Sequence, residues 1–304
     1  MWPVLFETIH RNPPPPEEYG GQDMEAELLC RTLNATHLMD YHDELSLSDS
    51  THWMTTPLGF TGDGLIARDI GLMPHLLIAG ATGMGKSMML SSILGWLHIR
   101  GASTDSVILI DSKSVDFYHY EDSPMIHRHV TSTREACEIL QNLAVAMDRR
   151  FSKIRALGAR DARGAGLAPW FVIIDEWADL VLQNKKLEIP LIRIAQKGRA
   201  AGMHLILATQ RPSRDVVTGL IKANFPARIC FGVTSRINSY IVLDDTGAET
   251  LGRPGESIYM HGIEKVRFKS IMWSDEAIMC AVKLYKARVK RISAKVRPTG
   301  RAWW

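Results

Sequence analysis

Short apolar runs alternate along the chain with longer stretches in which apolar residues recur every three or four positions. Such runs are typical of buried strands in a parallel sheet, and the longer pattern is typical of the helices that cover it. The runs predict strands over 76–79, 107–110, 170–174, 204–210, 228–232 and 256–260. The helical spacing predicts helices over 88–98, 133–157, 187–201 and 275–289, and a short helix or turn over 216–223. The alternation predicts an α/β fold with a mainly parallel central sheet covered by helices.

The same patterns predict four parts of the chain. Residues 1–21 include four consecutive prolines, which block helix formation and favour an extended segment. The pattern over residues 22–70 predicts a small lead-in subdomain with a helix, a short strand and a glycine-rich hairpin turn. Residues 71–274 make the α/β core, in which 265–273 is expected to be an edge strand. Residues 275–304 make a closing helix and a basic tail.

Composition narrows the class of protein. The 304 residues are 46% hydrophobic and 23% charged, as in ordinary globular proteins, and the net charge of +3 does not by itself indicate a nucleic-acid partner. The four cysteines lie far apart and show no metal-binding spacing, so we expect reduced thiols in a cytoplasmic protein. No apolar run is long enough for a membrane span, and the first residues lack the features of a signal peptide.

A phosphate-binding loop lies between the first predicted strand of the core and the helix after it. It follows the pattern G-x-x-x-x-G-K-[ST] and consists of Gly80, Ala81, Thr82, Gly83, Met84, Gly85, Lys86 and Ser87. Glycines let the backbone N–H groups turn toward phosphates, and the helix N-terminus adds a partial positive charge. Lys86 is suited to the β- and γ-phosphates and Ser87 to Mg²⁺. The loop therefore predicts binding of ATP with Mg²⁺.

A pair of acidic residues follows the predicted strand over 170–174. Asp175 at the strand end is a candidate Mg²⁺ ligand, and Glu176 is a candidate to orient and deprotonate the attacking water. Asp179 is a neighbouring alternative, although a solvated position in the following helix suits it better. About 90 residues separate this pair from the phosphate loop, in a β–α alternation that brings strand ends to one edge.

The stretch 196–213, continued by 219–224, closely resembles the motor domain of FtsK/SpoIIIE DNA translocases. Residues 74–80 resemble it as well, and so do 175–180, where phenylalanine is usual in place of Trp177. The resemblance runs from about Thr56 to Met260. It implies a RecA-like fold and a homo-hexameric ring, with double-stranded DNA pulled through the centre by ATP hydrolysis between subunits.

The resemblance also implies roles for individual residues. Gln210 matches the γ-phosphate sensor, and the alternative is a strand-end amide bonded to backbone. Arg199 matches an arginine that reaches the ATP of the neighbouring subunit, where its charge would offset that of the transferred phosphate. The alternative for Arg199 is a solvated arginine at a helix end.

Three cations match positions that face the DNA channel in the resembling motors: Arg211, Lys222 and Arg236. Lys and Arg suit contacts with phosphates of any sequence, and ordinary surface charge is the alternative for each. Tyr240 departs from the family pattern, since arginine is commoner there. Residues 251–255 also differ, forming a shorter turn that includes a proline.

Long members of the family carry N-terminal membrane spans and a C-terminal winged-helix module, and neither is found in this sequence. The resemblance and this architecture together favour a small motor of a plasmid, phage or integrative conjugative element. An ATP- and DNA-binding coupling protein, which would deliver a relaxase or replication protein without processive movement, is the alternative. A small-molecule P-loop kinase is a third hypothesis, against which the 196–224 block argues.

Overall fold

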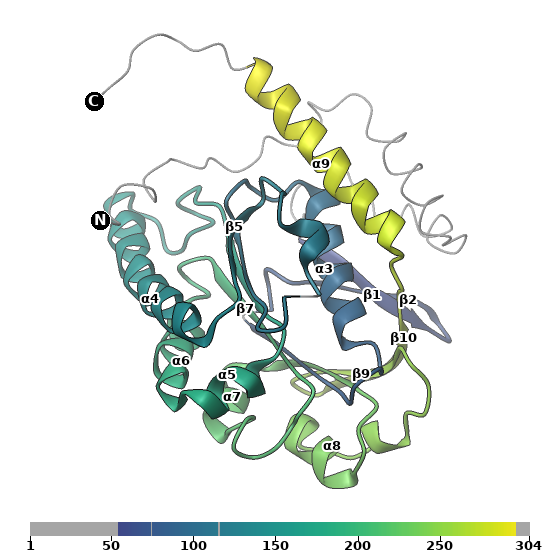
Figure 1. Ribbon diagram of the computed structural model, residues 1–304. Coiled ribbons are helices and arrows are strands. Elements are labelled where there is room, and N and C mark those ends of the chain that lie inside the picture. Colours follow the sequence, from purple (N-terminus) through teal and green to yellow (C-terminus); the bar gives the residue numbers. More distant parts are fainter. Residues whose placement is uncertain (1–53, 74, 115, 296–304) are drawn as a thin grey trace.

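The computed structural model describes residues 54–73, 75–114 and 116–295. In this part of the chain one sheet has the strand order β2-β1-β10-β9-β8-β3-β7-β6-β4-β5. Its strands are β1 (Thr55–Thr61), β2 (Gly64–Asp69), β3 (His75–Ala79), β4 (Val107–Ile110), β5 (Ile126–Val130), β6 (Trp170–Ile174), β7 (Met203–Thr209), β8 (Ala227–Phe231), β9 (Glu256–His261) and β10 (Glu264–Ser270). The α-helices are α3 (Lys86–Arg100), α4 (Thr133–Ala156), α5 (Trp177–Gln183), α6 (Glu188–Lys197), α7 (Gly219–Asn224), α8 (Arg236–Leu243) and α9 (Asp275–Lys295) (Figure 1).

The sheet is mixed, with a parallel block and an antiparallel extension. Strands β5, β4, β6, β7, β3 and β8 pair in parallel, in that order. Strands β9, β10, β1 and β2 then continue the sheet in antiparallel fashion. The α/β expectation of a mainly parallel sheet covered by helices is confirmed, and the carboxyl ends of the parallel strands meet at one edge, where ligands of such sheets bind.

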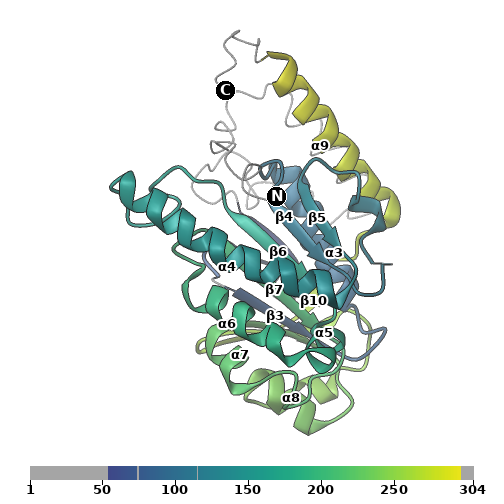
Figure 2. The same ribbon diagram turned by 60° about the vertical axis from the view of Figure 1, so that its left-hand side comes forward.

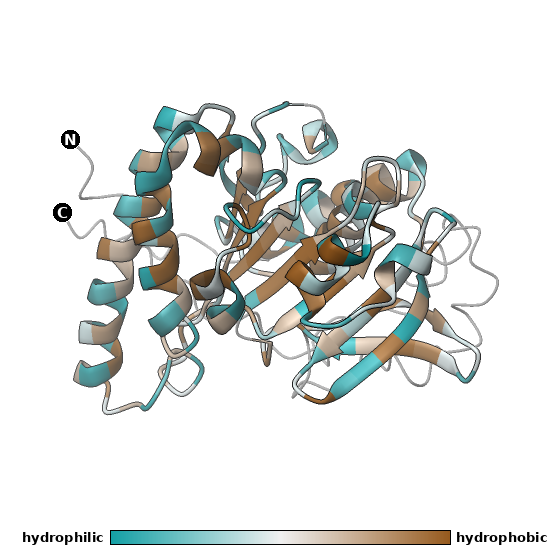
Figure 3. Ribbon diagram, turned by 90° about the horizontal axis from the view of Figure 1, so that it is seen from below, coloured by the Kyte–Doolittle hydropathy of each residue, from teal (hydrophilic) through white to brown (hydrophobic). Residues whose placement is uncertain are grey.

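Successive residues of the central strands face two separate cores. Leu76 and Ile78 of β3 pack with α3 and α9 on one face of the sheet. Leu77 and Ala79 pack with α4, α5, α6, α7 and α8 on the other face. Figure 2 shows α4 and α6 side by side over one face, and Figure 3 shows hydrophobic residues concentrated along the central strands. Burial on both faces explains why these strands read as unbroken apolar runs.

The structure corrects one strand prediction and adds elements that the pattern did not reveal. The stretch 265–273 is not an edge strand, because β10 lies between β9 and β1. Strand β5 is an edge strand of sequence IHRHV whose polar residues conceal it. Helix α8 was also not predicted. The helix expected over 187–201 ends at Lys197, and a turn follows it.

The described part of the lead-in region joins the central sheet directly. Strands β1 and β2 form a hairpin that pairs with β10 through Gly59 and Phe60. Trp96 of α3 donates its indole N–H to the carbonyl oxygen of Thr55. The expectations for residues 1–53 and 296–304 lie outside the described residues, and the fourfold division of the chain stays a prediction. Within the described helices, none is both long enough and apolar enough to cross a membrane.

Candidate nucleotide-binding site

The phosphate loop sits at the carboxyl end of β3, as the sequence predicts. Gly83 and Gly85 have φ values of 78° and 113°, a backbone region that L side chains rarely adopt. The N–H of Ala81 donates to the carbonyl of Gly232 over 2.8 Å, which ties the loop to the end of β8. Helix α3 begins at Lys86 and points its N-terminus at the loop. Strand, loop and helix therefore form an anion cradle.

Lys86 and Asp175 form a buried ion pair. The Lys86 Nζ donates to Asp175 Oδ1 over 2.5 Å and to the carbonyl oxygen of Asp175 over 2.8 Å. The other carboxylate oxygen of Asp175, Oδ2, is buried and has no hydrogen-bond partner among the described residues. Ser87 lies on the first turn of α3, next to Lys86. An orphaned carboxylate oxygen fits Mg²⁺, which binds through one or two carboxylates and substrate phosphates, and Ser87 is the candidate hydroxyl ligand.

Glu176 is held by three hydrogen bonds. Its Oε1 accepts from the Thr209 hydroxyl over 2.6 Å and from the N–H of Ala178 over 3.3 Å. Its Oε2 accepts from the N–H of Gln210 over 2.8 Å. Burial raises the pKa of Glu176, and the bonds from Thr209 and Gln210 oppose that rise. A fixed carboxylate with a raised pKa is suited to take a proton from water.

Gln210 connects the end of β7 to the phosphate loop. Its side-chain oxygen accepts from the Thr82 hydroxyl over 2.9 Å. Its backbone N–H is bonded to Glu176, so one residue contacts both the loop and the candidate base. The sensor role of Gln210 stays a prediction. Thr209, which the sequence reasoning did not single out, also contacts Glu176.

Asp116 is a further acidic residue at this edge that the sequence reasoning missed. Asp111, at the end of β4, accepts the N–H of Asp116 at Oδ2 over 3.2 Å and the N–H groups of Lys113 and Ser114 at Oδ1. Burial and the neighbouring Asp175 raise the pKa of Asp116 to about 6. The only signal in the sequence was an acidic residue five positions after a strand-end aspartate. Within the described part of the chain, no group of three His, Cys, Asp or Glu side chains forms a metal site by itself.

Arg199 lies far from this cluster. It sits in the turn after α6, immediately before the amino end of β7, whereas the phosphate loop follows the carboxyl end of the parallel strand β3. The length of β7 separates the two ends of the sheet by roughly 20 Å. The structure therefore does not bring Arg199 to the phosphate loop of its own chain.

Two of the three candidate DNA-binding cations come together in a cavity between α7 and α8. Lys222 and Arg236 line this cavity of about 560 Å³, together with Arg214, Ile237 and Tyr240. Arg214 is an addition that the sequence reasoning missed. Arg211 does not line the cavity; it is exposed at the end of β7, where its N–H donates to the Thr209 hydroxyl over 3.1 Å.

A buried arginine and a carboxylate organise this cavity. Asp244, the C-cap of α8, accepts from Lys222 at Oδ1 and from Arg228 at Oδ2. Arg228 also donates to the carbonyl oxygens of Phe225, Val242 and Lys222. These bonds join the ends of α7 and α8. They also offset the charge of Lys222, whereas Arg236 reaches Glu249 only at 4.0 Å and is largely exposed.

Comparison with known proteins places these features in a family. The FtsK/SpoIIIE family model matches residues 42–168 and 163–214. A DNA translocase FtsK of Chlamydia trachomatis is 41% identical over 212 residues, which are 62% of this chain and 26% of that protein. The Pseudomonas aeruginosa DNA translocase FtsK is 39% identical over 280 residues, which are 78% of this chain and 34% of that protein. The chain thus spans about a quarter to a third of the length of these relatives.

Solved structures show the same fold. The pCW3 conjugation coupling protein TcpA, in a monomer form with ATPγS, matches with a TM-score of 0.71 and 28% identity, over 79% of this chain and 73% of that one. The cytoplasmic domain of the Thermomonospora curvata type VII secretion ATPase EccC matches with a TM-score of 0.68 and 23% identity, over 77% of this chain and 31% of that one. The recognised motifs, the P-loop fold and the family match agree, and the chain belongs to the FtsK/SpoIIIE family.

Proposed function

We propose that this protein is an ATPase that translocates double-stranded DNA, working as a homo-hexameric ring with ATP sites between subunits. The observation that carries the proposal is the pair of hydrogen bonds joining Gln210 to Glu176 and to Thr82. Through these bonds a candidate base, a candidate phosphate sensor and the phosphate loop form one unit at the sheet edge. The relatives named DNA translocases support the choice of substrate.

In this proposal each site residue has a separate role in ATP hydrolysis. Lys86 and the loop amides hold the phosphates, and Ser87 and Asp175 hold Mg²⁺, which supplies charge neutralisation at the phosphates when bound. Glu176 takes a proton from the attacking water. Gln210 donates its side-chain N–H to the γ-phosphate, and its backbone N–H keeps Glu176 in place.

The decisive experiment is the steady-state ATPase rate of the purified protein with and without long linear duplex DNA. Lys86→Ala and Glu176→Gln are measured beside the wild type, and Lys153→Ala, an exposed change on α4, is the control. A rate stimulated by duplex in wild type and control, and abolished in the two site variants, supports the motor. Hydrolysis that ignores DNA contradicts it, and a phosphorylated small-molecule product would revive the kinase hypothesis.

A coupling or recruitment protein is the second candidate, favoured by the likeness to the conjugation coupling protein TcpA. Such a protein would bind ATP and DNA and deliver a relaxase or replication protein. Displacement of a triplex-forming strand from duplex DNA separates the two functions, because only a moving motor removes the third strand processively. DNA-stimulated hydrolysis without displacement would favour coupling.

The setting of the protein is part of the same proposal. We infer that it acts in the cytoplasm, in the maintenance or transfer of a plasmid, phage or integrative conjugative element. Arg211, Lys222 and Arg236 are the proposed DNA contacts, with Arg214 added by its place in the cavity between α7 and α8. Loss of plasmid or element transfer on deletion, with normal host chromosome segregation, is the expected phenotype.

A further inference from the structure

The turn that carries Arg199 is held at every backbone carbonyl. Its residues are 198–202, between α6 and β7. Backbone N–H groups donate to four of these carbonyls: Met203 to Gly198, Gly202 to Arg199, Ala162 to Ala200, and Trp170 to Gly202. The fifth carbonyl, that of Ala201, accepts from Arg150 Nε. A surface turn of this kind would ordinarily expose several carbonyls to water, so the full set of partners makes this one unusually constrained.

Arg150 is the side chain that completes this set. It comes from the last two turns of α4, and its Nε donates to the carbonyl of Ala201 over 2.6 Å. Its Nη2 donates to the carbonyl of Ala168 over 2.7 Å, and its guanidinium lies 4.7 Å from the ring centre of Trp170. Burial lowers the pKa of Arg150 to about 10, so the group remains a cation at neutral pH. The planar fork thus joins three segments that are distant in sequence.

The side chain of Arg199 contrasts with its backbone. It is exposed, and among the described residues no hydrogen bond or ion pair holds it. The phosphate loop of the same chain lies at the opposite end of the parallel strands, roughly 20 Å away along β7. A guanidinium on a fixed backbone, at the opposite strand ends from its own phosphate loop, suits a phosphate group on another molecule.

We propose that Arg150 is a positioning residue that fixes the 198–202 turn so that Arg199 meets the ATP phosphates of a neighbouring copy. This inference rests on the proposed function, in which ATP is hydrolysed between subunits. Arg150 touches neither nucleotide nor reacting atoms. It acts by holding the carbonyl of Ala201 two residues beyond Arg199.

The size of the expected effect follows from how steeply catalysis depends on placement. A misplacement of about 1 Å in a charged group costs on the order of a hundredfold in rate. Replacing Arg150 by glutamine removes the forked donor and the contact with Trp170 but leaves a polar side chain. We therefore expect Arg150→Gln to lower DNA-stimulated ATP hydrolysis by roughly tenfold to a hundredfold, with unchanged affinity for ATP.

The test mixes variant subunits. If Arg199 acts on the ATP of the adjacent subunit, loss of Arg150 in one subunit impairs hydrolysis in the adjacent subunit's site and not in its own. Arg150→Gln subunits keep an intact phosphate loop, and Lys86→Ala subunits keep an intact Arg150 and Arg199. Each is measured alone and as an equal mixture on long linear duplex DNA. Arg199→Ala mixed with Lys86→Ala is the reference, and Arg149→Gln, the exposed neighbour on α4, is the matched control.

We expect Lys86→Ala alone to be inactive and Arg150→Gln alone to be slowed by roughly tenfold to a hundredfold. The Arg150→Gln mixture should regain activity, as the Arg199→Ala mixture does. Binding of a fluorescent ATP analogue by Arg150→Gln should match the wild type, and Arg149→Gln should hydrolyse ATP normally. Arg150→Gln activity within twofold of wild type would overturn the inference. So would failure of its mixture to recover while the Arg199→Ala mixture recovers.

Failure of the proposed function gives a different pattern. If neither mixture recovers, Arg199 does not act in trans, and the inference falls together with that part of the function. If Arg150→Gln does not fold, Arg150→Lys replaces it, because lysine keeps the charge but cannot bridge Ala201 and Ala168 with a planar fork. Full activity of Arg150→Lys would then contradict the forked contact as the cause.

Discussion

Thr209 donates its hydroxyl proton to Glu176 Oε1 over 2.6 Å, between the ends of the adjacent strands β7 and β6. The same hydroxyl accepts the N–H of Arg211 over 3.1 Å. One buried hydroxyl therefore lies between a candidate catalytic base and a candidate DNA contact. The Thr209 hydroxyl thus connects the Glu176 carboxylate to the backbone of Arg211.

Thr209→Val tests the hydroxyl with little change of shape. We expect kcat for ATP hydrolysis to fall by roughly tenfold to a hundredfold, because Glu176 loses its shortest hydrogen bond and its orientation. ATP affinity should stay the same, since Thr209 contacts the phosphate loop only through its backbone carbonyl, which accepts the N–H of Gly80 and is kept in the variant. Thr209→Ser keeps the hydroxyl and should restore most of the rate. Equal rates for the valine and serine variants would contradict this reading.

Substitutions at Lys222 and Asp244 should change the affinity for DNA in opposite directions. Lys222→Ala should weaken binding to any duplex sequence and lower the salt slope by about one, as loss of one phosphate contact does. Asp244→Asn removes the carboxylate charge that offsets Lys222 and should strengthen binding at low salt. Fluorescence anisotropy across a salt series measures both, with Lys153→Ala as the control. A salt slope unchanged by Lys222→Ala would remove Lys222 from the DNA contacts.

Because three histidines are buried, the free energy of unfolding should decrease in mild acid. Burial lowers the pKa of His75 to about 3 and those of His98 and His204 to about 4. In the unfolded chain each returns to its ordinary value of about 6.5 and binds a proton first. The stability that these histidines contribute is therefore complete above pH 6.5 and is lost as the pH drops toward 4, by up to about 1.4 kcal/mol per pH unit for each histidine. Urea unfolding at pH 7.5, 6 and 5 measures the trend, and a flat profile would contradict it.

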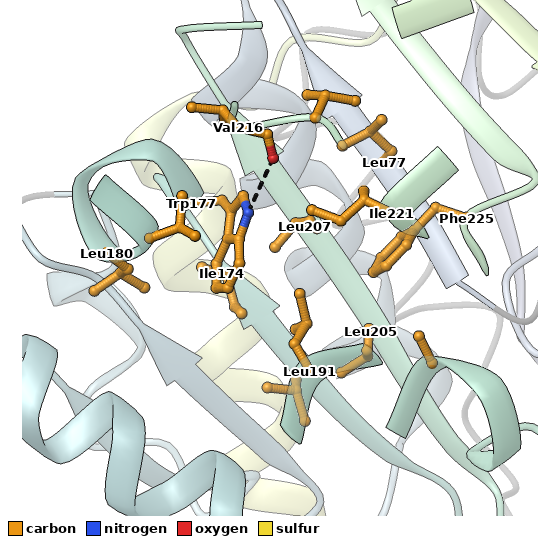
Figure 4. Close-up of a cluster of buried hydrophobic side chains, with 14 of the residues drawn as sticks. Leu77, Ile174, Trp177, Leu180, Leu191, Leu205, Leu207, Val216, Ile221 and Phe225 are labelled. Carbon is orange, nitrogen blue, oxygen red and sulfur yellow. Dashed lines mark hydrogen bonds between the residues drawn. The ribbon is translucent and has the colours of Figure 1, made fainter. Parts of the chain in front are cut away.

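Replacing Trp177, which follows the candidate base Glu176, should lower the stability of the fold. Its ring is fully buried, and its indole N–H donates to the carbonyl of Val216 over 3.2 Å (Figure 4). Trp177→Phe leaves that carbonyl without its donor and opens a small cavity next to Leu207. We expect the free energy of unfolding to fall by about 2 kcal/mol. Thermal or urea unfolding checks this, with the half-exposed Leu182→Ala as the control, expected to change little.

The sequence by itself determined the elements whose patterns are local. The apolar runs at β3, β4, β6 and β7 are buried on both faces, so each could be recognised without its neighbours. The phosphate loop and the Asp175–Glu176 pair follow their strands directly. Their convergence could be predicted because carboxyl ends of parallel strands share one edge.

Only the tertiary structure decided the contacts that join residues distant in sequence. Strand β10 looked like an edge strand because its exposed positions are polar, but the β1–β2 hairpin pairs beyond it. The hydroxyl of Thr209 and the fork of Arg150 carry no local signal, and the carboxylate of Asp116 carries only its spacing from Asp111. Each acquires its place from a backbone group or side chain on another element, which no spacing along the chain records.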